Sequence, residues 1–147
     1  MATPISRTAA EDLGILIKQT QALLHQRMDE ALRPLGVSVP QYVCLQALAD
    51  APGITGSDLA RRTFVSRQSM NVLLQSLEKK GLVQRSAVPG PRRERDTALT
   101  PRAERLVEDA RSRVAGVVDA ASATLGEQRI AALSADLAAY RDALRGS

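Results

Sequence analysis

The stretch SDLARRTFVSRQSMNVLLQSLEKKG, residues 57–81, decides the fold of this chain. Its apolar residues recur at helical spacing, but the pattern is interrupted between Thr63 and Ser66, which predicts two helices joined by a short turn. Leu59 anchors the first helix on the core. Ser66 is a typical N-cap for the second helix, and Gly81 is a typical C-terminal stop. The stretch therefore predicts a helix-turn-helix.

The second of these helices has one apolar face and one polar face. The side chains expected to point inward are Met70, Leu73, Leu74 and Leu77, and those expected to point outward are Arg67, Gln68, Asn71 and Gln75. Arginine pairs bidentately with guanine, and glutamine or asparagine pairs with adenine, in the major groove of DNA. No acidic residue precedes Glu78 in this helix. An ordinary amphipathic helix also has a polar outer face, so this pattern alone leaves both interpretations open.

After the helix-turn-helix, the spacing of apolar residues changes from helical to partly alternating. The segments LVQRSAV, residues 82–88, and RDTALT, residues 95–100, are short and partly alternating, and the stretch PGPRRERD, residues 89–96, supplies a turn between them. This arrangement predicts a β-hairpin with arginines at its tip. Such a hairpin beside a DNA-contacting helix can reach the minor groove, whose negative potential attracts guanidinium groups. A solvated surface turn is the alternative for any charge run.

Two helices are expected before the helix-turn-helix. The first spans about Thr8 to Arg33, because leucines and isoleucines recur there at three- and four-residue steps. Pro40 suits the first turn of a second, shorter helix that ends near Ala51.

Two further helices follow the predicted hairpin. Pro101 suits the first turn of a long helix, and Thr124 with Glu127 resembles a capping box for the last helix, which extends to about Leu144. The terminal helices are too long to bury their apolar stripes against the small centre of the chain. A second copy of the same chain is the expected partner.

Composition and charge favour a helical protein that faces a polyanion. Of the 147 residues, 44% are hydrophobic and only 2% are aromatic, which suits packed helices better than a β-sandwich. The formal net charge is +4, but residues 61–95 hold nine basic residues against two acidic ones. No apolar run approaches the ~18 residues of a membrane span, and no secretion signal is evident. The single cysteine suits a reducing compartment, so we expect a cytoplasmic protein.

Three segments together resemble the MarR family of winged helix-turn-helix regulators. They are LGVSVPQYVCLQALAD (35–50), GSDLARRTFVSRQSMNVLLQSLEKKGLVQR (56–85) and RERDTALTPRAERLV (93–107). The similarity is close from about Ser38 to Val107 and extends to the terminal helices by pattern only. It implies a mainly α fold, in which residues 37–100 form a winged helix-turn-helix DNA-binding domain. Residues 1–36 and 101–147 would form a dimerisation region within the same structural unit.

The resemblance also implies how such a protein works. A homodimer would place its two recognition helices in successive major grooves of a pseudo-palindromic site in double-stranded DNA, with the wings in the minor groove. The outcome would be repression or activation, of which we expect repression, often relieved by a small phenolic or other anionic ligand.

Each candidate DNA-binding residue is expected to have a definite role. Arg67, Gln68, Asn71 and Gln75 contact bases, Ser66 and Ser69 contact phosphate, Arg93 enters the minor groove, and Arg92 and Arg95 contact phosphate. One position departs from the family pattern, in which the wing carries Asp-x-Arg. The arginine falls on Arg93, but Pro91 occupies the place of the aspartate. Either Glu94 or Asp96 substitutes for it, or the wing is looser.

A ligand pocket is expected between the first, second and fifth helices. It would be lined by His25, Met28, Tyr42 and Arg113, although few aromatics are available to stack on a phenolic ring, so a regulator without a ligand is the alternative. Some relatives sense peroxides through a cysteine, but Cys44 lies beside apolar neighbours and is expected to be a core residue. One histidine and one distant cysteine make no metal site, and we expect no cofactor.

An enzyme is not expected. The sequence has no glycine-rich phosphate loop, no metal-ligand spacing and no pairing of a nucleophile with a base. The rival hypothesis is a helical protein-interaction adaptor that uses a winged-helix scaffold. The acid-poor basic segment argues against it, because an adaptor has no need for such a segment. Salt-dependent binding to duplex DNA distinguishes the two.

Overall fold

The computed structural model describes residues 4, 6–86 and 96–146. The elements follow in the order α1 (Ala9–Leu32), η1 (Arg33–Leu35), α2 (Val39–Asp50), α3 (Gly56–Thr63), α4 (Arg67–Lys79), β1 (Val83–Arg85), β2 (Thr97–Leu99), α5 (Pro101–Ser122) and α6 (Glu127–Arg145). The predicted mainly α fold with a hairpin after the helix-turn-helix is confirmed. Within the described part of the two stretches predicted to form the hairpin, the strands are the three residues of β1 and the three residues of β2; residues 87–95 lie outside the described residues.

Local capping explains where most of the helices begin. The side chain of Thr8 accepts a hydrogen bond from the backbone N–H of Glu11 at 3.1 Å, and the Glu11 carboxylate accepts one from the Thr8 N–H, which completes a capping box. Ser38 and Gln41 form the same reciprocal pair at the start of α2. Thr100 caps α5, with Pro101 in its first turn.

The capping box expected at Thr124 is wrong. The N-cap of α6 is Gly126, with φ 79°, and no side chain caps that helix. Leu125 lies in a turn closed by a hydrogen bond from its N–H to the carbonyl of Ser122, so α6 begins two residues later than a Thr124 cap requires. The turn depends on a positive φ, which glycine adopts without strain.

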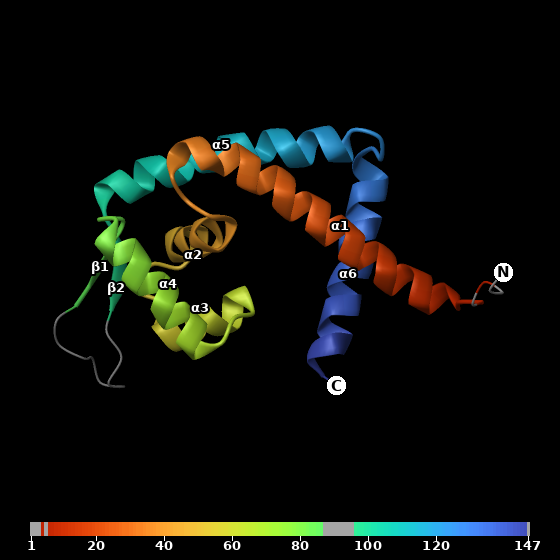
Figure 1. The fold of residues 1–147 in the computed structure, drawn as a ribbon, viewed down its shortest axis with the longest axis horizontal. Helices are drawn as coiled ribbons and strands as arrows, with labels where there is room; N and C mark the ends of the chain where they lie inside the picture. Colours follow the sequence, from red (N-terminus) through yellow and green to blue (C-terminus); the bar gives the residue numbers. More distant parts are fainter. Residues whose placement is uncertain (1–3, 5, 87–95, 147) are drawn as a thin grey trace.

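The elements divide into a roof and a compact body below it (Figure 1). α1 and α5 pack together along the roof, and α2, α3, α4 and the hairpin lie beneath one half of it. The strands pair antiparallel, with Val83 opposite Leu99 and Arg85 opposite Thr97. The core lies within the body and against the first turns of α5. Its fully buried large side chains are Leu32, Cys44, Leu45, Leu59, Met70, Leu74, Leu77, Leu82 and Val83.

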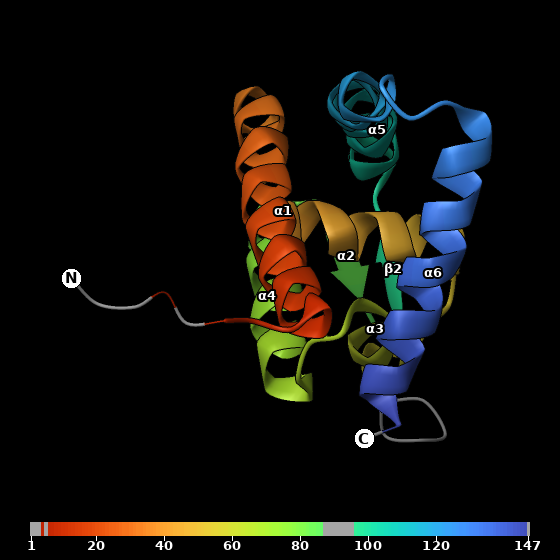
Figure 2. The same ribbon diagram turned by 90° about the vertical axis from the view of Figure 1, so that its right-hand side faces the viewer.

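The terminal helices leave most of their apolar residues uncovered. Leu32 is the only buried residue of α1, and α6 buries none. Figure 2 shows α1 and α6 on opposite sides of the molecule, with the end of α5 above and between them. Across the described residues, none of these helices combines the length and apolar character needed to cross a membrane.

Candidate nucleic-acid interface

The α4 helix has the two faces that its sequence predicts. Met70, Leu74 and Leu77 are at most 1% exposed and fix the helix on the core. The predicted base-contacting residues Arg67, Gln68, Asn71 and Gln75 are all exposed. The structure therefore brings these four side chains onto one open surface of the body. Val72 belongs to the same surface, but the sequence prediction did not include it, because it rested on side chains that form hydrogen bonds.

The N-terminal end of α4 is open to solvent and well ordered by its cap. Ser66 Oγ accepts a hydrogen bond from the backbone N–H of Ser69 at 3.0 Å, and the two hydroxyl oxygens are 2.9 Å apart. Phe64, in the turn before this cap, has φ 60°, and its ring packs against the Arg145 guanidinium, which lies 4.6 Å from the ring centroid. Both serines are exposed. A helix N-terminus with exposed hydroxyls suits a phosphate oxygen, which supports the roles predicted for Ser66 and Ser69.

The orientation of the Asn71 side chain is set by Arg85 on β1. Arg85 Nη1 donates a hydrogen bond to Asn71 Oδ1 at 3.1 Å. Because a guanidinium group only donates, the amide oxygen must face Arg85 and the amide nitrogen must point away from it. Asn71 thus presents two N–H donors outward, while one lone pair of its oxygen is already used. Sequence reasoning missed this role of Arg85, since nothing local links residues 14 positions apart.

The C-terminal end of α4 is tied to the rest of the body by polar contacts. Lys80 Nζ donates to the carbonyl of Gly36 at 2.8 Å and to Gln41 Oε1 at 3.0 Å. Gln41 Nε2 in turn donates to Ser76 Oγ at 3.2 Å. Arg102 Nη1 donates to the Lys80 carbonyl at 3.1 Å. One end of the helix is therefore fixed, and the other end projects with its cap exposed.

Several cations of the basic segment already have anionic partners. Arg61 forms an ion pair with Asp58 on the same helix, and Arg62 lies 3.9 Å from Asp50. Both arginine side chains are largely exposed, so solvent weakens these pairs and the arginines can still reach a phosphate. The predicted wing residues Arg92, Arg93 and Arg95, with Pro91 and Glu94, lie outside the described residues.

The four predicted pocket residues differ widely in exposure. His25 and Arg113 are exposed, Met28 is half-buried and Tyr42 is 3% exposed. Arg113 Nε lies 3.7 Å from the Asp109 carboxylate. Burial raises the pKa of the Tyr42 hydroxyl, an effect that the Arg111 guanidinium opposes and the Asp50 carboxylate adds to. Tyr42 is thus part of the core.

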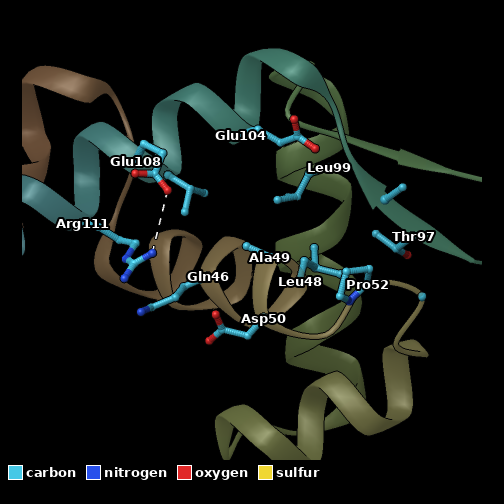
Figure 3. A pocket seen from close by; sticks show the side chains of 13 residues that line it. Gln46, Leu48, Ala49, Asp50, Pro52, Thr97, Leu99, Glu104, Glu108 and Arg111 are labelled. Carbon is cyan, nitrogen blue, oxygen red and sulfur yellow. Dashed lines mark ion pairs between the residues drawn. The ribbon is translucent and has the colours of Figure 1, made fainter.

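A cavity of about 430 Å³ lies between α2, β2 and α5 (Figure 3), and none of the four predicted pocket residues lines it. Its charged lining residues are Asp50, Glu104, Glu108 and Arg111, of which Arg111 Nη1 lies 3.8 Å from Glu108 Oε1. The acidic groups outnumber the single arginine, which does not suit an anionic ligand.

Cys44 is a core residue, as predicted. Its side chain is 1% exposed, its Sγ lies 3.6 Å from the sulfur of Met70, and burial raises the pKa of the thiol to about 12. Such a thiol is protonated and inaccessible at neutral pH. Within the described part of the chain, no group of three or more His, Cys, Asp or Glu side chains is placed to hold a metal ion.

An apolar groove of about 810 Å³ separates α1, the end of α5 and α6. Its apolar lining includes Leu23, Leu24, Val117, Val118, Leu133 and Leu137. More exposed apolar side chains, among them Leu13, Leu16, Tyr140 and Leu144, extend this surface along α1 and α6. Monomeric proteins rarely expose so large an apolar surface, which marks it as a site of protein association.

Comparison with known proteins gives a consistent result. The model of the MarR family matches residues 35–94. The HTH-type transcriptional repressor Rv2887 of Mycobacterium tuberculosis is 38% identical over 109 residues, which cover 69% of this chain and 78% of the relative. The HTH-type transcriptional regulator FarR of Neisseria gonorrhoeae is 30% identical over 142 residues, which cover 95% of this chain and 96% of the relative.

Solved structures agree with the sequence comparison. The structure of Rv2887 in complex with DNA superposes with a TM-score of 0.68 at 30% identity, over 87% of this chain and 96% of the other. The structure of Rv2887 with salicylic acid gives a TM-score of 0.67 at 32% identity, over 87% and 95% of the two chains. The likeness therefore extends beyond the matched domain to most of both chains.

Proposed function

This chain belongs to the MarR family, and from that membership we propose that it is a homodimeric transcriptional repressor that binds a pseudo-palindromic site in double-stranded DNA. The observation that carries the proposal is the outer face of α4. Arg67, Gln68, Asn71 and Gln75 are exposed together on a helix whose opposite face is buried, and no acid precedes Glu78 on that helix. Donors and acceptors on a helix face without acidic residues are what base edges between two rows of phosphates require. Rv2887, a relative that covers the same elements, has been solved with DNA.

Within this proposal, the residues of α4 and of the wing have different roles. Arg67, Gln68, Asn71 and Gln75 contact base edges, and Ser66 and Ser69 contact a phosphate at the N-terminus of the helix. Arg93 enters the minor groove and the neighbouring arginines Arg92 and Arg95 contact phosphates. The fixed C-terminal end of α4 supports this arrangement, because a helix that inserts its N-terminal half needs a rigid base.

Selection of bound sites from genomic DNA fragments, followed by affinity measurements over a range of salt concentrations, tests the proposal. We expect affinity for the selected duplex to fall steeply as salt rises, since cations on the protein displace counterions from phosphates. Arg67→Ala should cost ~1–3 kcal/mol and relax the preference at one base pair of each half-site. Binding without any sequence preference, or binding that salt does not weaken, would contradict the proposal and favour a protein-interaction adaptor.

Residues 1–36 and 101–147 serve dimerisation in this proposal, and residues 37–100 bind DNA. MarR-family proteins are dimers, and the apolar groove between α1, α5 and α6 supplies a surface that a second copy would cover. Sedimentation of the purified protein tests the assignment. A species of one 15.8 kDa chain at micromolar concentration would contradict it.

A small anionic molecule is proposed to release the repressor from DNA. Rv2887 has been solved with salicylic acid, and the exposed Arg113 of α5 offers a cation to an anionic molecule. His25 and Met28 would line the same site. Because Tyr42 is buried, a ligand that reaches its ring must displace packed side chains, and that displacement would move the body that carries α4. Titration of the protein–DNA complex with salicylate tests this, with Arg113→Ala expected to reduce the effect.

We propose that the protein acts without catalysis, because regulation of this kind needs only binding to DNA, and that it acts in the cytoplasm. MarR proteins are a family of transcriptional regulators, which supports this part of the proposal.

A further inference from the structure

Val72 lies at the centre of the outer face of α4, among polar side chains. A helix turns about 100° per residue, which places Val72 about 200° from the buried Met70. Gln68 and Ser69 precede it by one turn, and Gln75 and Ser76 follow it by one turn. Its side chain is 60% exposed, so no part of the core requires it.

Neither helix formation nor association explains a valine at this position. Valine is a poorer helix former than alanine or leucine, because its branched β-carbon restricts the side chain. The apolar surface expected to meet a second copy lies on α1, α5 and α6, and no residue of α4 lines its groove. An isolated exposed valine is common on proteins, so its position among predicted base-contacting residues is what gives it meaning.

The major groove offers one apolar group to a protein, the 5-methyl of thymine. Polar side chains can pair with the edges of the other bases, but only an aliphatic side chain gains by covering that methyl. Val72 carries two methyl groups at the centre of the outer face, more directly opposite the core than Asn71. Its branched side chain is stiff, so little conformational entropy is lost on contact.

We propose that Val72 contacts the 5-methyl group of one thymine in each half-site and thereby selects T·A over C·G at that base pair. This inference rests on the proposed DNA-binding function and adds a residue that specifies sequence without a hydrogen bond. It predicts that the contacted thymine lies between the bases that Gln68 and Gln75 contact, because those side chains flank Val72 along the helix.

Deoxyuridine substitution tests the contact, since uracil differs from thymine only by the missing methyl. Each thymine of a selected duplex is replaced in turn, and the affinity of the full-length wild-type protein is measured. Removing a methyl contact costs about 0.8 kcal/mol, so affinity should fall about fourfold at one thymine of each half-site. Val72→Ala removes the contact in both half-sites, so it should bind the thymine duplex about as well as wild type binds a duplex with uracil at both contacted positions, and should show no further loss at those positions.

Two substitutions of Val72 and one control substitution at Gln75 test whether the uracil effect depends on Val72. Val72→Thr keeps one methyl and should retain part of the uracil effect, whereas Val72→Ala favours the helix and is expected to fold. Gln75→Ala, on the same face, should alter preference at another base pair while leaving the uracil effect intact. A wild-type protein indifferent to uracil at every thymine, or a Val72→Ala variant that keeps the full effect, would overturn the inference. A wild-type protein that binds no duplex would overturn the proposed function itself.

Discussion

The hydrogen bond between Arg85 and Asn71 joins the hairpin to the face of α4 proposed to contact bases, and a double-mutant cycle can measure what it contributes to DNA binding. The perturbations are Arg85→Met, Asn71→Ala and the two together. Arg85 Nη1 and Asn71 Oδ1 are 3.1 Å apart. We expect Arg85→Met to release the Asn71 amide. The free energy of DNA binding then becomes less favourable, because the amide must be ordered again on binding.

The magnitude follows from the type of bond and its exposure. A hydrogen bond with a charged donor contributes about 1.5–3 kcal/mol when it is shielded from water. Arg85 is only half-buried and Asn71 is exposed, so solvent lowers the expected coupling to about 1 kcal/mol, or about fivefold in affinity. The double variant should therefore bind about fivefold more tightly than the sum of the two single losses predicts.

Fluorescence anisotropy with a labelled operator duplex, at a fixed salt concentration, gives the four affinities of the cycle. Arg85→Met also removes a positive charge, and a salt titration of each variant separates that contribution, because it changes the slope of affinity against salt. Arg85→Lys serves as the matched control, since it keeps the charge without the planar guanidinium. Additive losses within about 0.3 kcal/mol would show that the pair does not act together on DNA, and would refute the reasoning.

Three further predictions concern stability and capping. Ser66→Ala and Thr55→Ala each remove an N-cap, and each should lower the free energy of unfolding in urea by about 1 kcal/mol. Only Ser66→Ala should also weaken DNA binding. Equal affinities of the two variants for DNA would show that Ser66 acts as a cap alone. Leu77→Ala empties a site that is 0% exposed and should lower the free energy of unfolding by about 2–5 kcal/mol, a prediction that a loss under 1 kcal/mol would contradict. Burial raises the pKa of the Cys44 thiol from 9.0 to about 12. The stability that the protonated thiol contributes is therefore complete below pH 9 and is lost as the pH rises towards 12. Cys44→Ala should flatten this part of the curve of unfolding free energy against pH.

Helix limits could be predicted from the sequence because the signals that set them are local. Ser66 and Thr100 cap the helices that follow them, and Gly81, with φ 72°, ends the last turn after α4. The exception is also local in origin. Thr124 has the spacing of a capping box, but the positive φ of Gly126 starts α6 instead, and the sequence contained two competing signals there.

The contacts that orient the candidate site could not be predicted in the same way. Lys80 reaches Gly36 across 44 positions of the chain, and Arg85 reaches Asn71 across 14. Such pairs depend on how the helices pack, and no periodicity encodes them. Val72 was missed for another reason: base contacts were expected only from side chains that form hydrogen bonds, and valine forms none.

In the described part of the basic segment, residues 61–86, two cations are engaged in contacts that position α4. Lys80 donates to the Gly36 carbonyl and so holds the C-terminal end of the helix, and Arg85 holds Asn71. Because the hydrogen bonds of these cations position the helix, fewer cations are available to phosphates than the sequence count suggests. Affinity should therefore depend less steeply on salt than that count implies, because each phosphate contact contributes about 0.9 to the slope. A larger share of the binding free energy must then come from the major groove, where Arg67, Gln68 and Val72 are proposed to contact bases.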